Sequence, residues 1–208
     1  MTGAAPLRLG VLVSGRGSNL QALLDAGETR RIDAQVAVVV SDTPGAPALK
    51  RLEGRGIPGE TVARASFADA AAFEESVAEK LEACGVELVV LAGFMRVLSP
   101  FFIRRFAGRI VNVHPSLLPA FPGLHAQRQA LEHGVKVAGC TVHFVDESLD
   151  GGPIVAQAAV PVLPEDTEDS LSARILEEEH RLLPEVVGWY ADGLLEVCGR
   201  RVEIKKSK

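Results

Sequence analysis

The sequence is poor in cysteine, in aromatic residues and in long apolar runs. Its 208 residues include one tryptophan and one tyrosine, and its three cysteines are odd in number and show no paired spacing. A disulfide framework is therefore not expected, and a reducing cytoplasm is favoured. The first residues, MTGAAPLRLGVLV, lack the basic leader and apolar core of a secretion signal. No apolar run approaches the ~20 residues that span a bilayer, so no membrane association is expected.

An excess of basic charge is also missing. The chain has 22 Lys and Arg against 27 Asp and Glu, a net charge of −5. Proteins that bind nucleic acid need a basic surface for its phosphates, so a nucleic-acid partner is not expected. The histidines lack the spacing of metal ligands, which predicts no metal. The expected partners are small molecules, and the sequence leaves the oligomeric state open between monomer and homodimer.

Short aliphatic runs alternate with helical patterns along the chain. This order predicts an α/β fold with a doubly wound, mainly parallel sheet of Rossmann type. A late antiparallel hairpin is expected from residues 135–145 and 153–162. The whole chain, 1–208, is predicted to form one domain with flexible ends at 1–6 and 201–208. The residues beyond Gly193 also suggest a short strand pair before a basic tail. The runs that predict buried strands are Leu7–Val13, Gln35–Val40, Glu87–Leu91 and Arg109–Val113.

Two long helices are expected outside these strands. The run Ser66-Phe67-Ala68-Asp69 resembles a capping box and predicts the start of an alanine-rich helix that stops at Gly85. The second begins near Glu165 and carries an apolar stripe, and Pro184 is expected to kink or break it.

A glycine loop, residues 14–19, joins the first strand to a helix. Such a loop presents free N–H groups and the positive end of the helix dipole, which favours an anion. Gly17, Ser18 and Asn19 are the expected phosphate contacts. Two alternatives stay open: a plain glycine turn with a Ser or Asn helix cap, and a dinucleotide site with Asp42 on the ribose. The dinucleotide motif would need glycine at the position of Leu20.

Asn112 and His114 close the strand at residues 109–113. Side chains at i and i+2 of a strand project to one side, and ligands of parallel sheets sit at the carboxyl ends of strands. An amide beside an imidazole can stabilise an oxyanion and move a proton. The alternative is a strand-end Asn with a His that caps a turn.

The runs AGFMRVLSP, NVHPSLLPAFPGLHAQRQAL and SLDGGP closely resemble the glycinamide ribonucleotide transformylase family of purine synthesis. The resemblance extends back to SGRGSNLQALLDA and forward through EDTEDSLSARILEEEH, nearly the whole chain. It implies an enzyme that transfers a formyl group from 10-formyltetrahydrofolate to the primary amine of glycinamide ribonucleotide.

The resemblance also implies residue roles. Asn112 and His114 would be catalytic, and Asp150, which alone reads as an ordinary turn residue, would face His114 and favour its charged form. Glu179 would meet the amine or ribose of the substrate, although it could instead pair with an arginine. His114, Asp150 or a water between them would carry the proton.

The folate would lie on the run Met95, Arg96, Val97 and Leu98, and on Asn112. Large apolar side chains around one arginine suit a flat aromatic ligand, or could simply pack beneath their loop. Two positions depart from the family pattern. Ala70 replaces an arginine that many members carry on the folate side, and Gln127 replaces a histidine.

Other functions remain possible from the sequence. A 10-formyltetrahydrofolate hydrolase would share this catalytic core, with water in place of the amine. A non-catalytic nucleotide-binding module would use the glycine loop and leave His114 idle. His125 and His143 are interpreted as structural residues.

Overall fold

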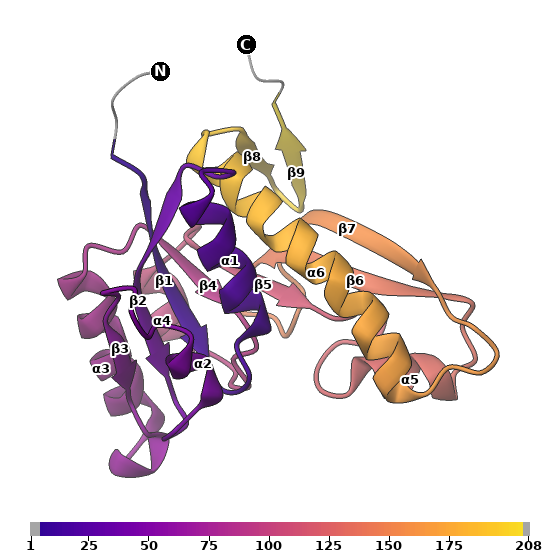
Figure 1. Cartoon of the computed structure of the whole chain (residues 1–208), viewed down its shortest axis with the longest axis horizontal. Coiled ribbons are helices and arrows are strands. Elements are labelled where there is room, and N and C mark those ends of the chain that lie inside the picture. Colours follow the sequence, from indigo (N-terminus) through magenta and orange to yellow (C-terminus); the bar gives the residue numbers. More distant parts are fainter. Residues whose placement is uncertain (1–4, 206–208) are drawn as a thin grey trace.

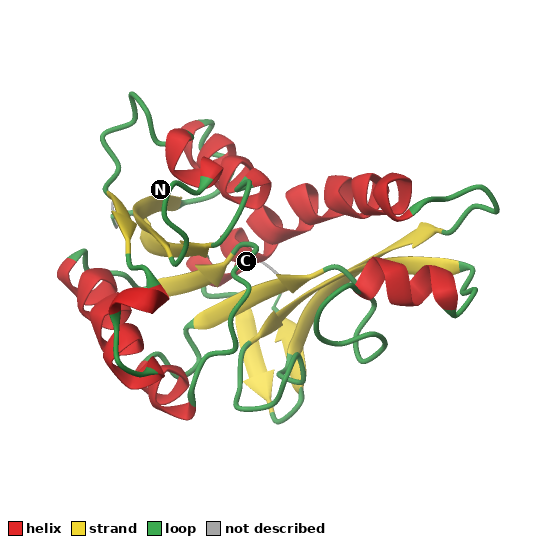
Figure 2. Ribbon diagram, turned by 90° about the horizontal axis from the view of Figure 1, so that it is seen from below, coloured by secondary structure: helices red, strands yellow, loops and turns green. Residues whose placement is uncertain are grey.

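The computed structural model describes residues 5–205 and shows a nine-stranded sheet with helices on both faces (Figures 1 and 2). The strand order is β3-β2-β1-β4-β5-β6-β7-β9-β8. The strands are β1 (Leu7–Val13), β2 (Ala34–Ser41), β3 (Gly59–Thr61), β4 (Leu88–Leu91), β5 (Ile110–His114), β6 (Val137–Phe144), β7 (Ile154–Pro161), β8 (Leu195–Cys198) and β9 (Arg201–Ile204). The helices are α1 (Ser18–Glu28), α2 (Pro47–Lys50), the 3₁₀ helix η1 (Arg64–Ser66), α3 (Ala70–Ala83), α4 (Pro100–Arg105), α5 (Ala126–Glu132) and α6 (Glu168–Ala191).

The first five strands are parallel and the later ones mostly antiparallel. Strand β1 pairs in parallel with β2 and β4, and β4 pairs in parallel with β5. Strands β5, β6 and β7 are antiparallel to one another. These pairings confirm the predicted sheet and its late hairpin. The chain runs outward from β1 to β3 and then returns to β4, which makes the β1–β4 boundary a switch point where ligands bind in such folds.

Both faces of the central strands are buried, which explains their continuous aliphatic runs. From β1, Leu9 and Val11 join a core with α1 and α6, whereas Leu12 joins a second core with α3 and α4. Helices α1 and α6 lie side by side on one face (Figure 1). This pairing carries α6, late in the chain, to the glycine loop after β1.

The expected start of α3 is wrong by several residues. Asp69, not Ser66, caps the helix, and its carboxylate accepts a hydrogen bond of 2.8 Å from the Ala72 N–H. Residues 64–66 form the separate helix η1, and the extended backbone of Phe67 separates the two helices. Ser66 and Asp69 both have side-chain oxygens that can cap a helix, and in the structure Asp69 is the cap.

Pro184 does not break α6, which continues to Ala191. A proline removes its own N–H donor and crowds the carbonyl of the preceding turn, but Leu183, Val186 and Val187 around it are fully buried, so packing holds the helix together. The short strand pair expected beyond Gly193 is present as β8 and β9, so the flexible end expected at 201–208 is corrected for Arg201–Ile204. Residues 1–4 and 206–208, in the other parts of the expected flexible ends, lie outside the described residues. Within residues 5–205, no helix has the length and hydropathy to cross a membrane.

Candidate active site

The loops that follow β1 and β4 are tied to each other at the switch point of the sheet. The Ser14 N–H donates to the Gly93 carbonyl at 3.1 Å, and the Ser14 hydroxyl accepts from the Met95 N–H at 3.0 Å. These bonds join the glycine loop, expected to hold phosphate, to the loop expected to hold folate. The topology therefore brings the two predicted ligand sites to one edge of the sheet.

Helix α1 begins in the manner of an anion site. Its N-cap is Gly17 at φ 70°, and no side chain in the described part of the chain caps it. The N–H groups of its first turn are thus free for a ligand. A Cβ on Gly17 would lie 2.6 Å from that of Ala48, so the loop packs tightly on α2. The alternative of a Ser or Asn helix cap is therefore wrong, because Gly17 is the N-cap.

Glu179 reaches this loop from α6. The Asn19 amide Nδ2 donates to its carboxylate at 2.7 Å, and each residue is only 7% exposed. Burial raises the pKa of Glu179 to about 7, against the smaller opposing effect of the Asn19 hydrogen bond. The partner is thus an amide and not the arginine considered from sequence. Among the described residues, Asn19 Oδ1 is buried and has no partner.

Asp42 is committed elsewhere. It is 6% exposed and forms an ion pair with Arg96, so its carboxylate is not free for a ribose as the dinucleotide alternative required.

Asn112 faces His143 across the antiparallel pair β5–β6. Their Nδ2 and Nε2 atoms lie 3.2 Å apart, and His143 Nδ1 lies 2.9 Å from the Phe144 carbonyl oxygen. A carbonyl only accepts, so Nδ1 carries the proton and Nε2 accepts from Asn112. Burial lowers the pKa of His143, although the bond to Phe144 opposes this, and the ring stays neutral near pH 7. His143 therefore fixes the orientation of the Asn112 amide.

His114 and Asp150 complete the cluster. His114, 5% exposed, donates from Nε2 to the Phe121 carbonyl at 2.9 Å, while its Nδ1 lies 3.5 Å from Asp150 Oδ2. Asp150 also accepts from the Gly123 N–H at 2.7 Å and has φ 48°, a conformation rare outside glycine and often found at functional sites. Because 3.5 Å exceeds a normal hydrogen bond, His114 Nδ1 is not committed to Asp150, and it can donate to a ligand when the ring carries a second proton.

Thr141 supports the turn that carries His114. It lies opposite His114 in the β5–β6 register, donates to the Ser116 carbonyl at 2.7 Å and accepts from the Leu118 N–H at 3.0 Å. Gln157 on β7 donates to the Thr141 hydroxyl and to the Leu118 carbonyl, both at 2.9 Å. These buried and part-buried bonds tie the loop to the sheet.

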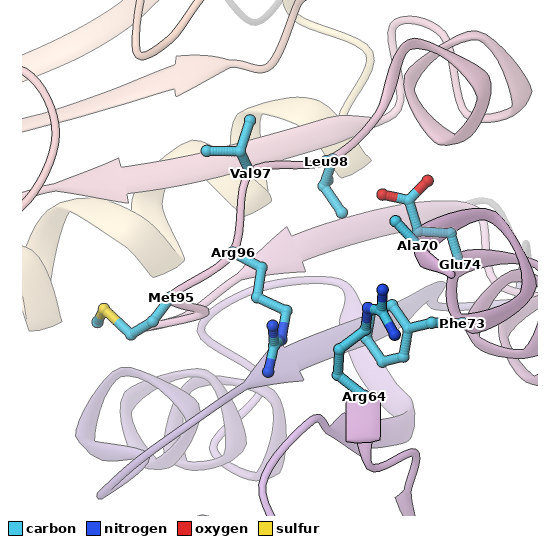
Figure 3. A pocket seen from close by; sticks show the side chains of 8 residues that line it. All are labelled: Arg64, Ala70, Phe73, Glu74, Met95, Arg96, Val97 and Leu98. Carbon is cyan, nitrogen blue, oxygen red and sulfur yellow. The ribbon is translucent and has the colours of Figure 1, made fainter. Parts of the chain in front are cut away.

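The loop Met95–Leu98 lines a cavity of about 300 Å³ together with Arg64, Ala70, Phe73 and Glu74 (Figure 3). The side chains of Arg96 and Leu98 point into the cavity, whereas those of Met95 and Val97 point outward. Met95 is 64% exposed and Val97 77% exposed. The alternative that all four pack beneath the loop is therefore wrong for these two, which are available to a ligand.

The sequence interpretation missed the place of His143. Its Nε2 lies 3.8 Å from Asp150 Oδ1, inside the predicted catalytic cluster and not apart from it. Its position opposite Asn112 would have shown this, but the register of an antiparallel pair is not visible in the sequence. His125, by contrast, is exposed at the start of α5. In residues 5–205, no group of three or more His, Cys, Asp or Glu side chains is arranged to hold a metal.

Comparison with known proteins gives a consistent result. A family model described as formyl transferase matches residues 7–187. Phosphoribosylglycinamide formyltransferase of Escherichia coli (strain K12) is 46% identical over 187 residues, which are 90% of this chain and 88% of that protein. A trifunctional purine biosynthetic protein of Drosophila melanogaster is 50% identical over 188 residues, 89% of this chain but only 14% of its own length.

A solved structure, glycinamide ribonucleotide transformylase 1 from Symbiobacterium toebii, superposes with a TM-score of 0.96 at 53% identity. The match covers 98% of this chain and 96% of that one. The family predicted from the sequence runs is thereby confirmed, and so is the fold. The chain belongs to the formyl transferase family.

Proposed function

We propose that this protein transfers the formyl group of 10-formyltetrahydrofolate to the amine of glycinamide ribonucleotide, in de novo purine biosynthesis. The products are formylglycinamide ribonucleotide and tetrahydrofolate. The observation that carries the proposal is the meeting of an uncapped helix N-terminus, a buried carboxylate and an Asn–His–Asp cluster at one sheet edge, in a chain of this family. The three unpaired cysteines support the cytoplasm as the place of the reaction.

The ribonucleotide would bind along α1. Its phosphate would accept hydrogen bonds from the N–H groups of Gly17, Ser18 and Asn19, where the helix dipole favours negative charge. Glu179, held by Asn19, would accept from a ribose hydroxyl or the substrate amine. A buried carboxylate with a single protein hydrogen bond has capacity left for such a donor.

The amine then attacks the formyl carbon, and negative charge develops on the formyl oxygen. Asn112 Nδ2 donates one N–H to His143 and has a second N–H for this oxygen. His114 Nδ1, when protonated, is the second donor. Each such donor contributes roughly 10²–10³ in rate in comparable sites.

Proton transfer completes the reaction as the tetrahedral intermediate collapses. A proton leaves the attacking amine, and one must reach the departing folate nitrogen. Asp150 lies 3.5 Å from His114 Nδ1, a separation that a proton crosses through a short movement or one bridging water. The folate itself would lie against Met95 and Val97, whose side chains are exposed beside the cavity.

The test is formyl transfer by the purified protein, followed as tetrahydrofolate release with and without glycinamide ribonucleotide. We expect release to depend on the ribonucleotide and to be lost in His114→Ala. His133→Asn, which changes an exposed histidine at the end of α5, serves as the matched control and should keep wild-type activity.

Two outcomes would contradict the proposal in different ways. Equal release without the ribonucleotide would identify a hydrolase, in which water takes the place of the amine. Ribonucleotide binding without any release would identify a non-catalytic binding module.

A further inference from the structure

The loop at residues 146–152, which joins β6 to β7, carries Asp150 in a disfavoured backbone conformation. Its φ of 48° lies in the left-handed region, where a residue other than glycine stays only when surrounding contacts hold it. The Gly123 N–H holds the side chain, because it donates to the Asp150 carboxylate at 2.7 Å. The contacts that hold the backbone next to Asp150 therefore influence where its carboxylate lies relative to His114.

The chain that follows Asp150 is fixed to the sheet almost at once. A Cβ on Gly152 would collide with the Phe144 carbonyl oxygen, so glycine is required for this close approach. The Phe144 N–H also donates to the Pro153 carbonyl at 2.9 Å. Gly151 is thus the single residue between this fixed stretch and Asp150.

Gly151 is held by an arginine from the C-terminal hairpin, β8–β9. The Arg200 Nη2 donates to the Gly151 carbonyl at 3.0 Å, and among the described residues this carbonyl is the hydrogen-bond partner of that side chain. Cys198 pairs with Arg201, which leaves Gly199 and Arg200 as the turn of the hairpin. The hairpin lies beside β7, where β9 pairs with the first residue of that strand (Figure 1).

We propose that Arg200 is a positioning residue that holds Asp150 beside His114 and thereby sets the rate of proton transfer. The inference rests on the proposed function, in which Asp150 takes part in that transfer. Asp150 Oδ2 lies 3.5 Å from His114 Nδ1, so a small displacement of the loop changes how readily a proton crosses between them. A charged donor binds a carbonyl more strongly than a neutral donor does, which suits Arg200 to holding the peptide next to Asp150.

Replacing Arg200 by glutamine removes both the charge and the reach of the donor. We expect kcat for formyl transfer to fall roughly three- to tenfold, the effect of one hydrogen bond on a reaction rate. The KM for glycinamide ribonucleotide should stay unchanged, because that substrate would bind along α1. Arg200→Lys keeps a charged donor and should retain more of the wild-type kcat than Arg200→Gln does.

Hydrogen–deuterium exchange measures the hold on the loop without any turnover. Peptides that cover residues 146–152 should exchange faster in Arg200→Gln than in the wild type, and peptides of α1 should exchange equally. Arg201→Gln is the matched control, because it changes the neighbouring arginine, whose exposed side chain forms no hydrogen bond or ion pair within residues 5–205. It should leave both kcat and loop exchange at wild-type values.

The outcomes distinguish this inference from the proposed function. In a protein that transfers formyl groups, an unchanged kcat or an unchanged loop exchange in Arg200→Gln refutes the role of Arg200. An equal rise of exchange in α1 would indicate general loosening and refutes it as well. If the wild type transfers no formyl group and Arg200→Gln still speeds exchange of the loop alone, the hold on Asp150 stands and the proposed function is refuted. A thermal unfolding curve for each variant verifies that it folds.

Discussion

Replacing Glu179 by glutamine should stabilise the protein at neutral pH. The carboxylate is 7% exposed, and burial raises its pKa from the ordinary value of 4.5 to about 7. Between these values the folded protein holds a proton that the unfolded chain has released. The free energy of unfolding of the wild type therefore falls as the pH rises through this window, and the full cost is present above it.

The size of the effect follows from the two pKa values. At about 1.4 kcal/mol for each pKa unit, their difference corresponds to about 3 kcal/mol. Glutamine has the shape of the protonated acid and keeps an oxygen for the Asn19 amide. Its own N–H groups also offer a donor to Asn19 Oδ1, which has no partner among the described residues. Glu179→Gln should thus gain about 3 kcal/mol near pH 8 and almost nothing near pH 4.

Urea unfolding at a series of pH values measures this difference. Glu177→Gln is the matched control, because it makes the same change two residues away on the exposed face of α6. A stability gain that is equal at all pH values, or equal in the two variants, would refute the burial argument. Formyl transfer should meanwhile weaken through a higher KM for the ribonucleotide, since the carboxylate is proposed to bind it. The more stable variant would then be the poorer enzyme.

Three further predictions concern the cluster and the loop. Asn112→Ala should lower kcat by roughly 10²–10³, because it removes a hydrogen-bond donor to the oxyanion. Steady-state kinetics measure this loss, and a much smaller one would contradict the role of Asn112. His143→Leu leaves Asn112 Nδ2 without its acceptor and should lower kcat about tenfold. Because burial lowers the pKa of His143, wild-type stability should rise with pH up to about 6.5, and urea unfolding of His143→Leu should lack this contribution. Gly17→Ala places a Cβ at φ 70° and 2.6 Å from Ala48, so it should cost about 1–3 kcal/mol and raise KM for the ribonucleotide; an unchanged KM would refute the phosphate site.

Local patterns predicted the elements well where one physical requirement dominated. The aliphatic run at residues 7–13 predicted a strand buried on both faces, and β1 is such a strand. Ser99-Pro100 predicted a helix start, and the Ser99 hydroxyl caps α4 by accepting a hydrogen bond from the Phe102 N–H. Where two requirements competed, the sequence was less decisive. Pro184 lacks an N–H donor, yet the buried residues around it keep α6 intact.

The sequence by itself determined the strand and helix pattern, the glycine loop and the place of His114 at a strand end, because each depends on neighbouring residues alone. Tertiary structure decided which distant groups meet. It joined Asn19 to Glu179, 160 residues away, and set His143 opposite Asn112 by strand register. It also placed Arg64, from η1, at the cavity that Ala70 lines. Such contacts depend on how the helices and strands pack and pair, and a pattern of neighbouring residues does not specify that arrangement.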